Sequence, residues 1–528
     1  MTNSINELAA ADCILITGSN TTEQHPVIAG KILEAVRRGA AIIIFDPRRI
    51  QLSPYASMHL AQKPGTDVAC INAMMKVVID EGLFDREFVT SRTEGFEDLK
   101  RSLDGCTPEW ASGITGVPAG DLAKAARTFA GARSGSIVYC MGITQHTSGT
   151  DNVKALANLA MLTGNVGRPS TGVNPLRGQN NVQGACDVGG LPEFYPGYQR
   201  VDDEKAARKF EKAWGRELPR GRGLTLMEMI EAASSGKVKF MYILGENPLV
   251  SDPNTNHVRA ALENLDFLVV QDIMETDTTA LADVVFPGAC WAEKEGTFTN
   301  TERRVQRVRK AVEPPGEALA DWEVLCRLAR EMGAPGFDFS SPEEVFDEMA
   351  TLTPQYAGIG YGCLGTTGLQ WPCPTADHPG TVFLHEGEFT RGKGRFNPVE
   401  YRPPAEPADD EYPFTLMTGR ITFQYHTGTM TRNSPSLDRE VESAYIEVNP
   451  ADADGLGVSD GGRVKVASRR GELILAARLT DRVKPGEVFM PFHFAESPAN
   501  VLTSDALDPV SRIPELKVCA VRIERVGS

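Results

Sequence analysis

Hydrophobic residues in the first third of the chain come in short runs that end at a glycine or a charged residue. Residues 12–17 read Asp-Cys-Ile-Leu-Ile-Thr, and residues 41–45 read Ala-Ile-Ile-Ile-Phe. Uninterrupted runs of this length are typical of parallel strands that are buried on both faces. The polar loop 18–26 and a stretch of helical periodicity at 27–38, which ends at Gly39, lie between them. This order predicts a right-handed strand–helix–strand unit.

The same pattern continues further along the chain. A second strand–helix–strand unit starts near residue 236, and polar residues follow its strands. Open parallel sheets bind their ligands at the carboxyl ends of the strands, so the sequence predicts two ligand-binding edges. The further elements that we expect are helices at 67–81, 119–130 and 255–264, and strands at 136–140, 238–244 and 267–270.

The C-terminal part has a different character. From residue 412 onward, short alternating strands separated by glycines, such as 462–468 and 471–478, predict a β domain. Residues 333–410 are rich in proline and glycine and show little periodicity, so we expect a long linking region there. The predicted fold class is α/β with two Rossmann-like domains and a C-terminal β domain. The expected boundaries are 1–180, 181–332, 333–410 and 411–528.

Composition narrows the class of protein. With 528 residues the chain is too long for one core, since a domain takes roughly 150 residues. A net charge of −16 argues against a general nucleic-acid or anionic-membrane binder. The ten cysteines are scattered without a CxxC pair, which fits buried thiols in a reducing compartment. The sequence has no apolar run long enough to span a membrane, and its first residues do not resemble a signal peptide.

Two loops carry candidate chemistry. Asp46 can accept hydrogen bonds from ribose hydroxyls, and Arg48 offers a forked donor for phosphate. The first loop reads G-S-N-T-T-E rather than G-x-G-x-x-G, so an ordinary structural turn is the alternative. Arg177 lies in a loop of glycines and amides and can clamp a small carboxylate with two parallel hydrogen bonds. A structural loop is the alternative there too, and His426 and His493 are lone histidines without metal-ligand spacing.

Several stretches together match one known family, in the family's order. The chain resembles the catalytic alpha subunit of molybdenum- or tungsten-dependent formate dehydrogenases, within the molybdopterin oxidoreductase (DMSO reductase) family. The match spans essentially the whole chain, and NPLRGQNNVQGACD at 174–187 is the most specific part. The other matching stretches include GSNTTEQHP at 18–26, DPRR at 46–49, KPGTD at 63–67, MGITQHTSG at 141–149, ILGENPLVSD at 243–252, VVQDIMETDT at 269–278 and TGRITFQYHTGTMTR at 418–432.

The resemblance implies site residues position by position. Arg177 matches the arginine that orients formate, and the β domain is implied to be a double-psi barrel. The implied cofactor is bis-molybdopterin guanine dinucleotide with molybdenum or tungsten. One guanine dinucleotide arm would be held by Gly18, Asn20, Glu23, Asp46, Arg48, Gly65, Asp67, Met141, Gly142 and Gln145. Gly178 and Gln179 would lie near its pterin. The other arm would be held by Asn247, Ser251, Gln271, Asp272, Thr276 and Asp321. Both pterins would be covered by Thr418, Arg420, Gln424, His426, Asn500 and Lys517.

One departure from the family is large. Its subunits begin with a four-cysteine [4Fe-4S] segment, followed by the selenocysteine or cysteine that ligates the metal and then a histidine. None of these is in the 528 residues. We therefore expect that the sequence starts at an internal methionine downstream of a selenocysteine codon, with a natural fragment as the alternative. These residues alone are then expected to be inactive.

The expected partners are formate or CO2 and electron-transfer subunits, either iron–sulfur or flavin proteins, including hydrogenase. The expected location is the cytoplasm, although an export signal could lie on the missing segment. Two other readings stay open, a molybdopterin oxidoreductase with another substrate and a non-catalytic subunit that carries the cofactor. A nicotinamide dehydrogenase is the weakest reading, because the G-x-G-x-x-G pattern is absent.

Overall fold

The computed structural model describes residues 1–526. They form two compact units. The first unit comprises residues 1–176, 250–256 and the chain from 383 onward, and the second unit comprises 177–249 and 257–382. The interval expected as a linker is thus divided, because 333–382 belongs to the second unit and 383–410 to the first.

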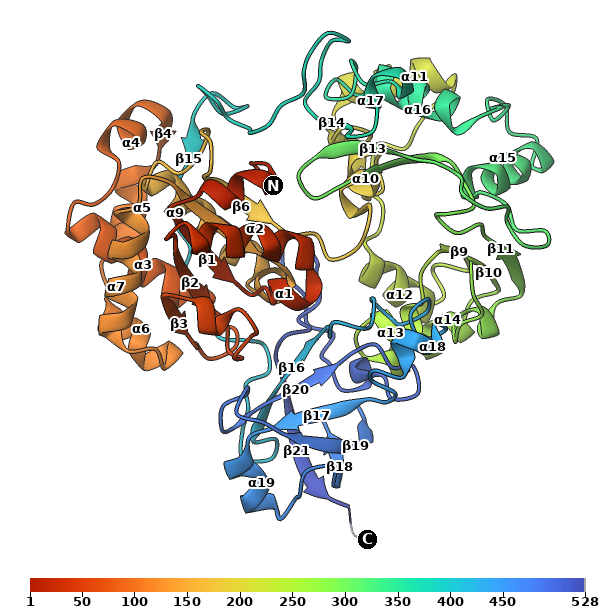
Figure 1. Cartoon of the computed structure of the whole chain (residues 1–528). Coiled ribbons are helices and arrows are strands. Elements are labelled where there is room, and N and C mark those ends of the chain that lie inside the picture. The colour runs from red at the N-terminus through yellow and green to blue at the C-terminus, as the bar shows by residue number, and fades with distance from the viewer. Residues whose placement is uncertain (527–528) are drawn as a thin grey trace. The chain divides into compact units, whose positions relative to one another are not determined.

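A parallel sheet with the strand order β3-β2-β1-β5-β6 forms the centre of the first unit (Figure 1). Cys13 in β1 lies opposite Ala41 in β2 and opposite Gly135 in β5, so these three strands run in the same register. The strands predicted at 12–17 and 41–45 are confirmed, the first beginning one residue later, at Cys13. The bounds are β1 Cys13–Thr17, β2 Ala41–Phe45, β3 Met58–Leu60, β5 Gly135–Tyr139 and β6 Gly172–Pro175.

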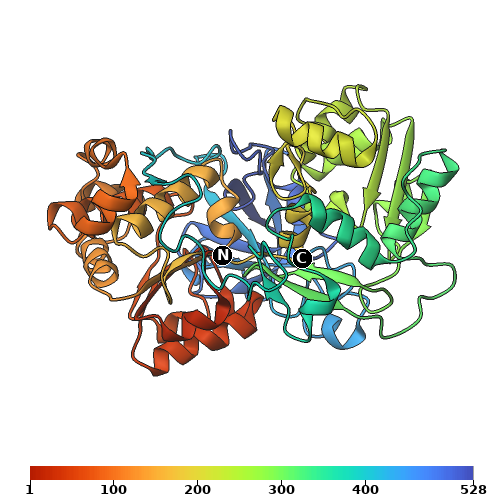
Figure 2. The same ribbon diagram turned by 90° about the horizontal axis from the view of Figure 1, so that it is seen from above.

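Alternate residues of these strands pack into two different cores. Leu15 and Ile43 belong to one core, with residues of α3 (Asp67–Asp80), α7 (Ala119–Ala130) and α9 (Gly149–Leu162). Ile14 and Ile42 belong to the other, with residues of α2 (Pro26–Arg37). Figure 2 shows α2 on one side of the sheet and the other helices across it. Helices on both faces explain why the strands read as continuous hydrophobic runs.

The C-terminal part of the first unit is a closed β-barrel, as the sequence predicted. The strands follow one another around the barrel in the order β16-β20-β17-β19-β18-β21. Leu416, Ile446, Val464, Val488 and Val521 pack inside it. The finer prediction of a double-psi connection stays a prediction. The bounds are β16 Phe414–Gly419, β17 Tyr445–Val448, β18 Arg463–Ala467, β19 Glu472–Leu479, β20 Glu487–Pro491 and β21 Cys519–Arg525.

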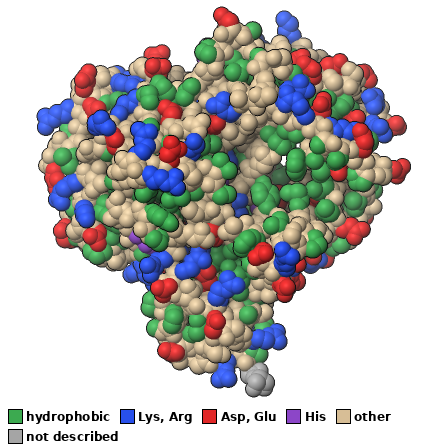
Figure 3. Space-filling view, in the orientation of Figure 1, with side chains coloured by type: hydrophobic (Ala, Val, Ile, Leu, Met, Phe, Trp, Pro, Cys, Tyr) green, Lys and Arg blue, Asp and Glu red, His purple; other side chains and the backbone are tan. Residues whose placement is uncertain are grey.

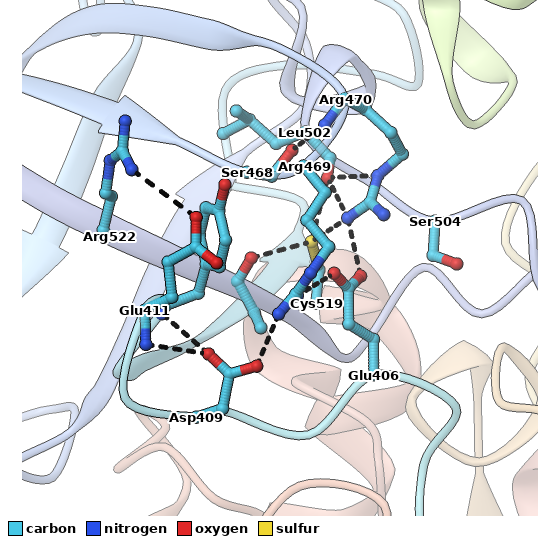
Figure 4. Close-up of polar contacts among 12 residues, drawn as sticks. Glu406, Asp409, Glu411, Ser468, Arg469, Arg470, Leu502, Ser504, Cys519 and Arg522 are labelled. Atoms are coloured by element: carbon cyan, nitrogen blue, oxygen red, sulfur yellow. Dashed lines mark hydrogen bonds and ion pairs between the residues drawn. The ribbon is translucent and has the colours of Figure 1, made fainter.

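The segment that leads into the barrel is fastened to it by ion pairs (Figure 4). Glu406 accepts hydrogen bonds from Arg469 and Arg470, at 2.6 Å each. Arg469 also donates to Asp409 at 2.5 Å, and Arg470 donates to the Leu502 carbonyl at 2.9 Å. We call these four charged residues the barrel strap. They hold a segment without regular structure against the turn between β18 and β19.

The second unit contains a parallel sheet with the order β11-β10-β9, whose bounds are Val284–Pro287, Phe267–Asp272 and Phe240–Leu244. Helices α12 (Leu226–Ser234) and α14 (Thr255–Glu263) contribute to its core. Phe240 and Phe267 lie on this sheet at 55% and 42% exposure, with their ring centroids 5.9 Å apart. Figure 3 shows hydrophobic side chains gathered over these strands.

The rest of the second unit contains helices and short antiparallel strands. Strands β12 (Gly296–Thr299), β13 (Arg304–Val308) and β14 (Leu369–Gln370) pair with one another. Helix α16 (Pro342–Leu352) lies inside the interval expected as a linker. Its start has clear signals, because Ser341 caps the Glu344 amide and Pro342 occupies the first turn. Further helices are α10 (Val182–Asp187), α11 (Glu204–Trp214) and α15 (Asp321–Glu331).

The described residues lack two features that would change the class of protein. No helix among residues 1–526 combines the length and apolar character needed to cross a membrane. The same residues hold no group of three or more His, Cys, Asp or Glu side chains arranged for a metal ion.

Candidate functional site

A pocket opens at the carboxyl ends of β1, β2 and β5 in the first unit. Its empty volume is about 760 Å³, including space open to solvent. The pocket is lined by loops after these strands, by the start of α3 and by three segments of the barrel part, at 417–420, at 489–492 and at Lys517. We call it the strand-end pocket. Of the residues predicted for the first dinucleotide arm and its cover, the structure brings together Gly18, Asn20, Asp46, Arg48, Gly65, Asp67, Met141, Gly142, Thr418, Arg420 and Lys517.

Two glycines let the loops of this pocket touch backbone to backbone. Gly18 has a φ of +56°, and a Cβ atom built on it would lie 2.5 Å from the Gly142 carbonyl carbon. The Gly142 amide donates to the Gly18 carbonyl at 3.1 Å. A side chain at either position would push the two loops apart. The loop therefore makes its close backbone approach without a G-x-G-x-x-G pattern.

Carboxylates border one part of the strand-end pocket. Burial raises the pKa of Asp46 to about 6, against the opposing effects of the Arg48 backbone hydrogen bond and charge. Burial also raises the pKa of Asp67, although Gln62 donates to it at 2.9 Å. Among the described residues, Asn20 Nδ2 and Gln62 Oε1 are buried without a hydrogen-bond partner. Buried polar atoms of this kind are rare in folded proteins, so the pocket offers hydrogen bonds to a polar ligand.

Cations border another part. Burial, together with the positive charge of the nearby Arg420, lowers the pKa of Lys517 to about 8. Lys517 donates to the Thr418 carbonyl at 2.8 Å. A positive charge that is poorly solvated gains most from an anionic ligand. Carboxylates and cations in one pocket suit a ligand with both hydrogen-bond donors and phosphates.

Arg48 was expected to offer its guanidinium to a phosphate, but in the structure this group already has protein partners. Its Nε and Nη2 atoms donate to the Glu447 carboxylate at 3.1 and 2.8 Å. The guanidinium also lies 3.5 Å from the ring centroid of Phe489. Arg48 lines the pocket, but much of its donor capacity is used inside the first unit. Glu447 lies 399 residues away in the sequence, so spacing gave no sign of the pair.

Other predicted cover residues are also placed within the first unit. Asn500 donates to the Ser251 carbonyl at 2.9 Å, which brings these two predicted residues together. His493 Nδ1 donates to the His426 carbonyl, and the Ile421 amide donates to His493 Nε2 at 3.0 Å. This pairing defines a neutral ring, and burial lowers the pKa of His493 to about 3. His493 therefore acts structurally, whereas His426 contributes its backbone carbonyl to this contact. Gln424 accepts from Thr431 at 2.7 Å, Glu23 pairs with Arg482, and Gln145 ends the turn at Met141–Thr144.

The second unit holds the predicted residues of the other arm around β9 and β10. Gln271 donates to Asp321 Oδ1 at 2.8 Å and accepts from Tyr242 at 2.5 Å. Lys294 pairs with the other oxygen of Asp321. Asn247 accepts from Thr278 at 2.6 Å. Burial raises the pKa of Asp272, and the Thr276 amide donates to Thr279.

Arg177 begins the second unit and is held at two points. Its backbone amide donates to the Thr301 hydroxyl at 3.1 Å. Its guanidinium donates to Gln183 Oε1 from Nε at 3.3 Å and from Nη2 at 3.1 Å. Gly178 and Gln179 follow it directly in the same loop. Sequence reasoning did not single out Gln183 as a site residue, although it lies within the most specific matching stretch.

Comparison with known proteins gives the class. The family model for molybdopterin oxidoreductases matches residues 1–331, and the model for the molybdopterin dinucleotide binding domain matches residues 414–520. The chain belongs to the molybdopterin oxidoreductase family. This agrees with an α/β chain that ends in a β-barrel and carries a pocket at the strand ends.

Individual relatives show which members of the family this chain resembles. The F420-dependent formate dehydrogenase subunit alpha of Methanocaldococcus jannaschii is 55% identical over 530 residues, covering 100% of this chain and 78% of the relative. Formate dehydrogenase H of Escherichia coli is 42% identical, covering 100% of this chain and 74% of the relative. Among solved structures, acetylene hydratase from Pelobacter acetylenicus superposes with a TM-score of 0.76 at 22% identity, covering 99% of this chain and 81% of that one. That last likeness concerns the fold alone.

Proposed function

We propose that the chain is part of the alpha subunit of a formate dehydrogenase, which converts formate to CO2, a proton and two electrons, or runs the reverse reaction. The observation that carries the proposal is Arg177. A half-buried guanidinium fixed at its backbone and side chain suits the recognition of a small carboxylate. The formate dehydrogenase names of the relatives support the same substrate.

The cofactor that we propose is bis-molybdopterin guanine dinucleotide. When bound, it supplies a molybdenum or tungsten centre that takes up the two electrons of formate. The strand-end pocket fits one guanine dinucleotide arm. Asp46 and Asp67 can accept from the N–H groups of guanine, Asn20 Nδ2 can donate to its oxygen or nitrogen acceptors, and Lys517 can pair with phosphate.

We assign the other arm to Asn247, Gln271, Asp272, Thr276 and Asp321 of the second unit. Gln271 and Asp321 form a polar pair beside Asp272, at the carboxyl end of a parallel strand, where such sheets bind ligands. Gly178 and Gln179 are assigned to a pterin, and the loop containing Arg420, Gln424 and His426 to the cover. The contribution of the chain is to bind the cofactor and to orient formate. It supplies position and charge rather than a covalent intermediate.

The proposal extends to partners. Electrons that arrive in pairs must leave the metal centre, so we propose electron-transfer subunits of the iron–sulfur or flavin type. F420, which the name of the Methanocaldococcus relative specifies, is the first acceptor to test. The cytoplasmic location and the expected inactivity of the 528 residues alone stay predictions.

The test replaces Arg177 in a full-length, cofactor-loaded enzyme, because these 528 residues alone are expected to be inactive. We expect the wild type to reduce a redox dye in a formate-dependent way, and Arg177→Lys to lose at least about 100-fold in kcat/KM, or about 2.7 kcal/mol. A lysine ammonium cannot reproduce two parallel hydrogen bonds to a carboxylate. The matched control is Arg309→Lys, an exposed arginine of the same unit, which should keep wild-type kinetics.

Guanine and metal content are measured in each preparation. Arg177→Lys with full cofactor content and low turnover supports the assignment. Near wild-type kcat/KM in that variant contradicts the role of Arg177. A wild type that carries metal and guanine but never responds to formate contradicts the substrate, and favours a subunit that only carries the cofactor.

A further inference from the structure

A buried carboxylate with four neutral donors lies at the end of α10. Asp187 is 1% exposed. Its Oδ1 accepts from the Gln183 amide at 2.8 Å and from the Tyr198 hydroxyl at 2.7 Å. Its Oδ2 accepts from the Tyr356 hydroxyl at 2.5 Å and from the Trp371 indole at 2.7 Å. These bonds solvate the buried carboxylate without a cation among the donors. We call the five residues the Asp187 network.

The network sets the orientation of one amide. Gln183 Nε2 donates to Asp187 Oδ1 at 2.8 Å and to the Tyr198 oxygen at 2.9 Å. Both amide hydrogens are then used on one side, so Oε1 points to the other. A flipped amide would put its oxygen against the Asp187 carboxylate and lose both bonds. The negative charge of Asp187 therefore decides which end of the Gln183 amide faces outward.

The outward end of that amide holds Arg177. Gln183 Oε1 accepts from Arg177 Nε and Nη2, at 3.3 and 3.1 Å. Two bonds to a single oxygen fix the direction of the guanidinium plane. A carboxylate that pairs with two parallel N–H bonds needs this plane to be correct, because a small rotation misaligns both bonds.

We propose that Asp187 is a positioning residue, which orients the Arg177 guanidinium for its carboxylate substrate through the Gln183 amide. The inference rests on the proposed function, because it gives Arg177 a carboxylate to hold. Tyr356 and Trp371 lie 169 and 184 residues from Asp187 in the sequence, so the orientation of Arg177 depends on the folding of the second unit.

Asp187→Asn is the central variant. It keeps the shape of the side chain but removes the charge that orients Gln183. In cofactor-loaded enzyme we expect kcat/KM for formate to fall at least about 10-fold. In the Arg177→Lys background the same change should cost less than about 2-fold, because the group through which Asp187 acts is already altered. An equal loss in both backgrounds overturns the proposal, since a general structural defect would give that result.

A second readout needs no turnover. Phenylglyoxal modifies accessible guanidinium groups, and mass spectrometry measures the extent at each arginine. We expect faster modification of Arg177 in Asp187→Asn than in the wild type, with Arg309 unchanged as the internal reference. Equal modification rates at Arg177 overturn the proposal. The phenylglyoxal measurement tests the role of Asp187 even if the wild type does not turn over formate. Absence of turnover in the wild type would contradict the proposed function instead.

Two further variants guard against misfolding. Gln183→Met has a similar length but lacks the accepting oxygen, so it should reproduce both effects while leaving the Asp187 charge in place. Wild-type kinetics and wild-type Arg177 reactivity in Gln183→Met overturn the proposal. The control is Tyr195→Phe in the same unit, which removes a buried hydroxyl that has no hydrogen-bond partner among the described residues. It should leave both readouts unchanged.

Discussion

Buried carboxylates in the two units have different surroundings. In the first unit, Glu487 in β20 has an Oε2 atom without a hydrogen-bond partner among the described residues, and burial raises its pKa to about 7. Asp46, whose negative charge adds to that rise, borders the strand-end pocket. In the second unit, both oxygens of Asp187 accept two hydrogen bonds each.

The difference separates two uses of buried charge. A buried carboxylate that lacks hydrogen-bond partners is destabilised when it is ionised. Binding of a proton or of a ligand that donates hydrogen bonds relieves this, so we expect the strand-end pocket to depend on pH and on ligand binding. Burial also raises the pKa of Asp187, but its four hydrogen bonds oppose that rise, so its charge can hold a neighbour in place. The predictions that follow test the first use against the second.

The largest expected effect is on cofactor retention, from Lys517→Met. The substitution keeps an unbranched side chain but removes a poorly solvated cation from the strand-end pocket. We expect the guanine content of the purified protein to fall at least about 10-fold, because phosphate loses a charge-assisted partner. Guanine released on denaturation and quantified by chromatography measures it.

Lys517→Met should not lower the thermal stability of the cofactor-free protein, although it lowers guanine content. Burial of Lys517 disfavours its charge, so Lys517→Met should leave the Tm unchanged or raise it. Lys465→Met, a half-buried lysine paired with Glu472 and Glu524 on the barrel, is the control and should retain its guanine. Unchanged guanine content in Lys517→Met would show that this cation does not serve the ligand.

A smaller effect is expected for Glu487→Gln, and it depends on pH. The pKa of Glu487 is raised from 4.5 to about 7 in the folded state, so the contribution of this group to stability is fully present below pH 4.5 and is lost as the pH rises through 7. Above pH 7 the ionised group costs up to about 3 kcal/mol. We expect the cofactor-free variant to be more stable than the wild type at pH 8.5 and equal to it at pH 4.5.

Urea unfolding at the two pH values measures this difference. Glu472→Gln, an exposed carboxylate on β19, is the control and should show no such pH dependence. A Glu487→Gln variant that is less stable than the wild type at pH 8.5 would show that the ionised carboxylate is stabilised by its neighbours. The contrast with Asp187 would then fail.

The sequence predicted the regular elements well where pattern and packing agree. The strand at 41–45 is β2 and the helix at 119–130 is α7, because both have uninterrupted local signals and sit in a two-sided sheet. Helix α16 was not predicted, because it lies in a proline-rich interval, although its Ser341-Pro342 start is a recognisable helix signal. A lack of helical periodicity is therefore weak evidence of a loop where helix-capping residues are present.

The candidate site was predicted only in part, and the reason is distance along the chain. Arg177 stood out because glycines and amides flank it. The partners that orient it do not stand out, because Tyr198, Tyr356 and Trp371 have no common spacing from Asp187. The same holds for Arg48, whose open fork was expected and whose partner is Glu447. Buried polar pairs depend on tertiary packing, which a single sequence does not display.

The smallest expected effect concerns the barrel strap, where charges are paired near the surface. Arg470→Ala removes bonds to Glu406 and to the Leu502 carbonyl, and Arg470 is largely shielded from water, so we expect a loss of about 1–2 kcal/mol in the free energy of unfolding. Arg469→Ala removes two ion pairs and the contact of the guanidinium with the Tyr412 ring, whose centroid lies 4.4 Å away. Its side chain is more exposed, at 38%, so the substitution should lower the Tm less. The ion-pair part of this effect should be lost in about 1 M salt, because screening then acts within ~3 Å, while the effect of Arg470→Ala should persist. Thermal unfolding of the barrel with and without salt distinguishes the two. Equal, salt-sensitive losses for both arginines would mean that the strap is held by surface charge alone, and that complete pairing of a buried group is a property of the Asp187 network rather than of both units.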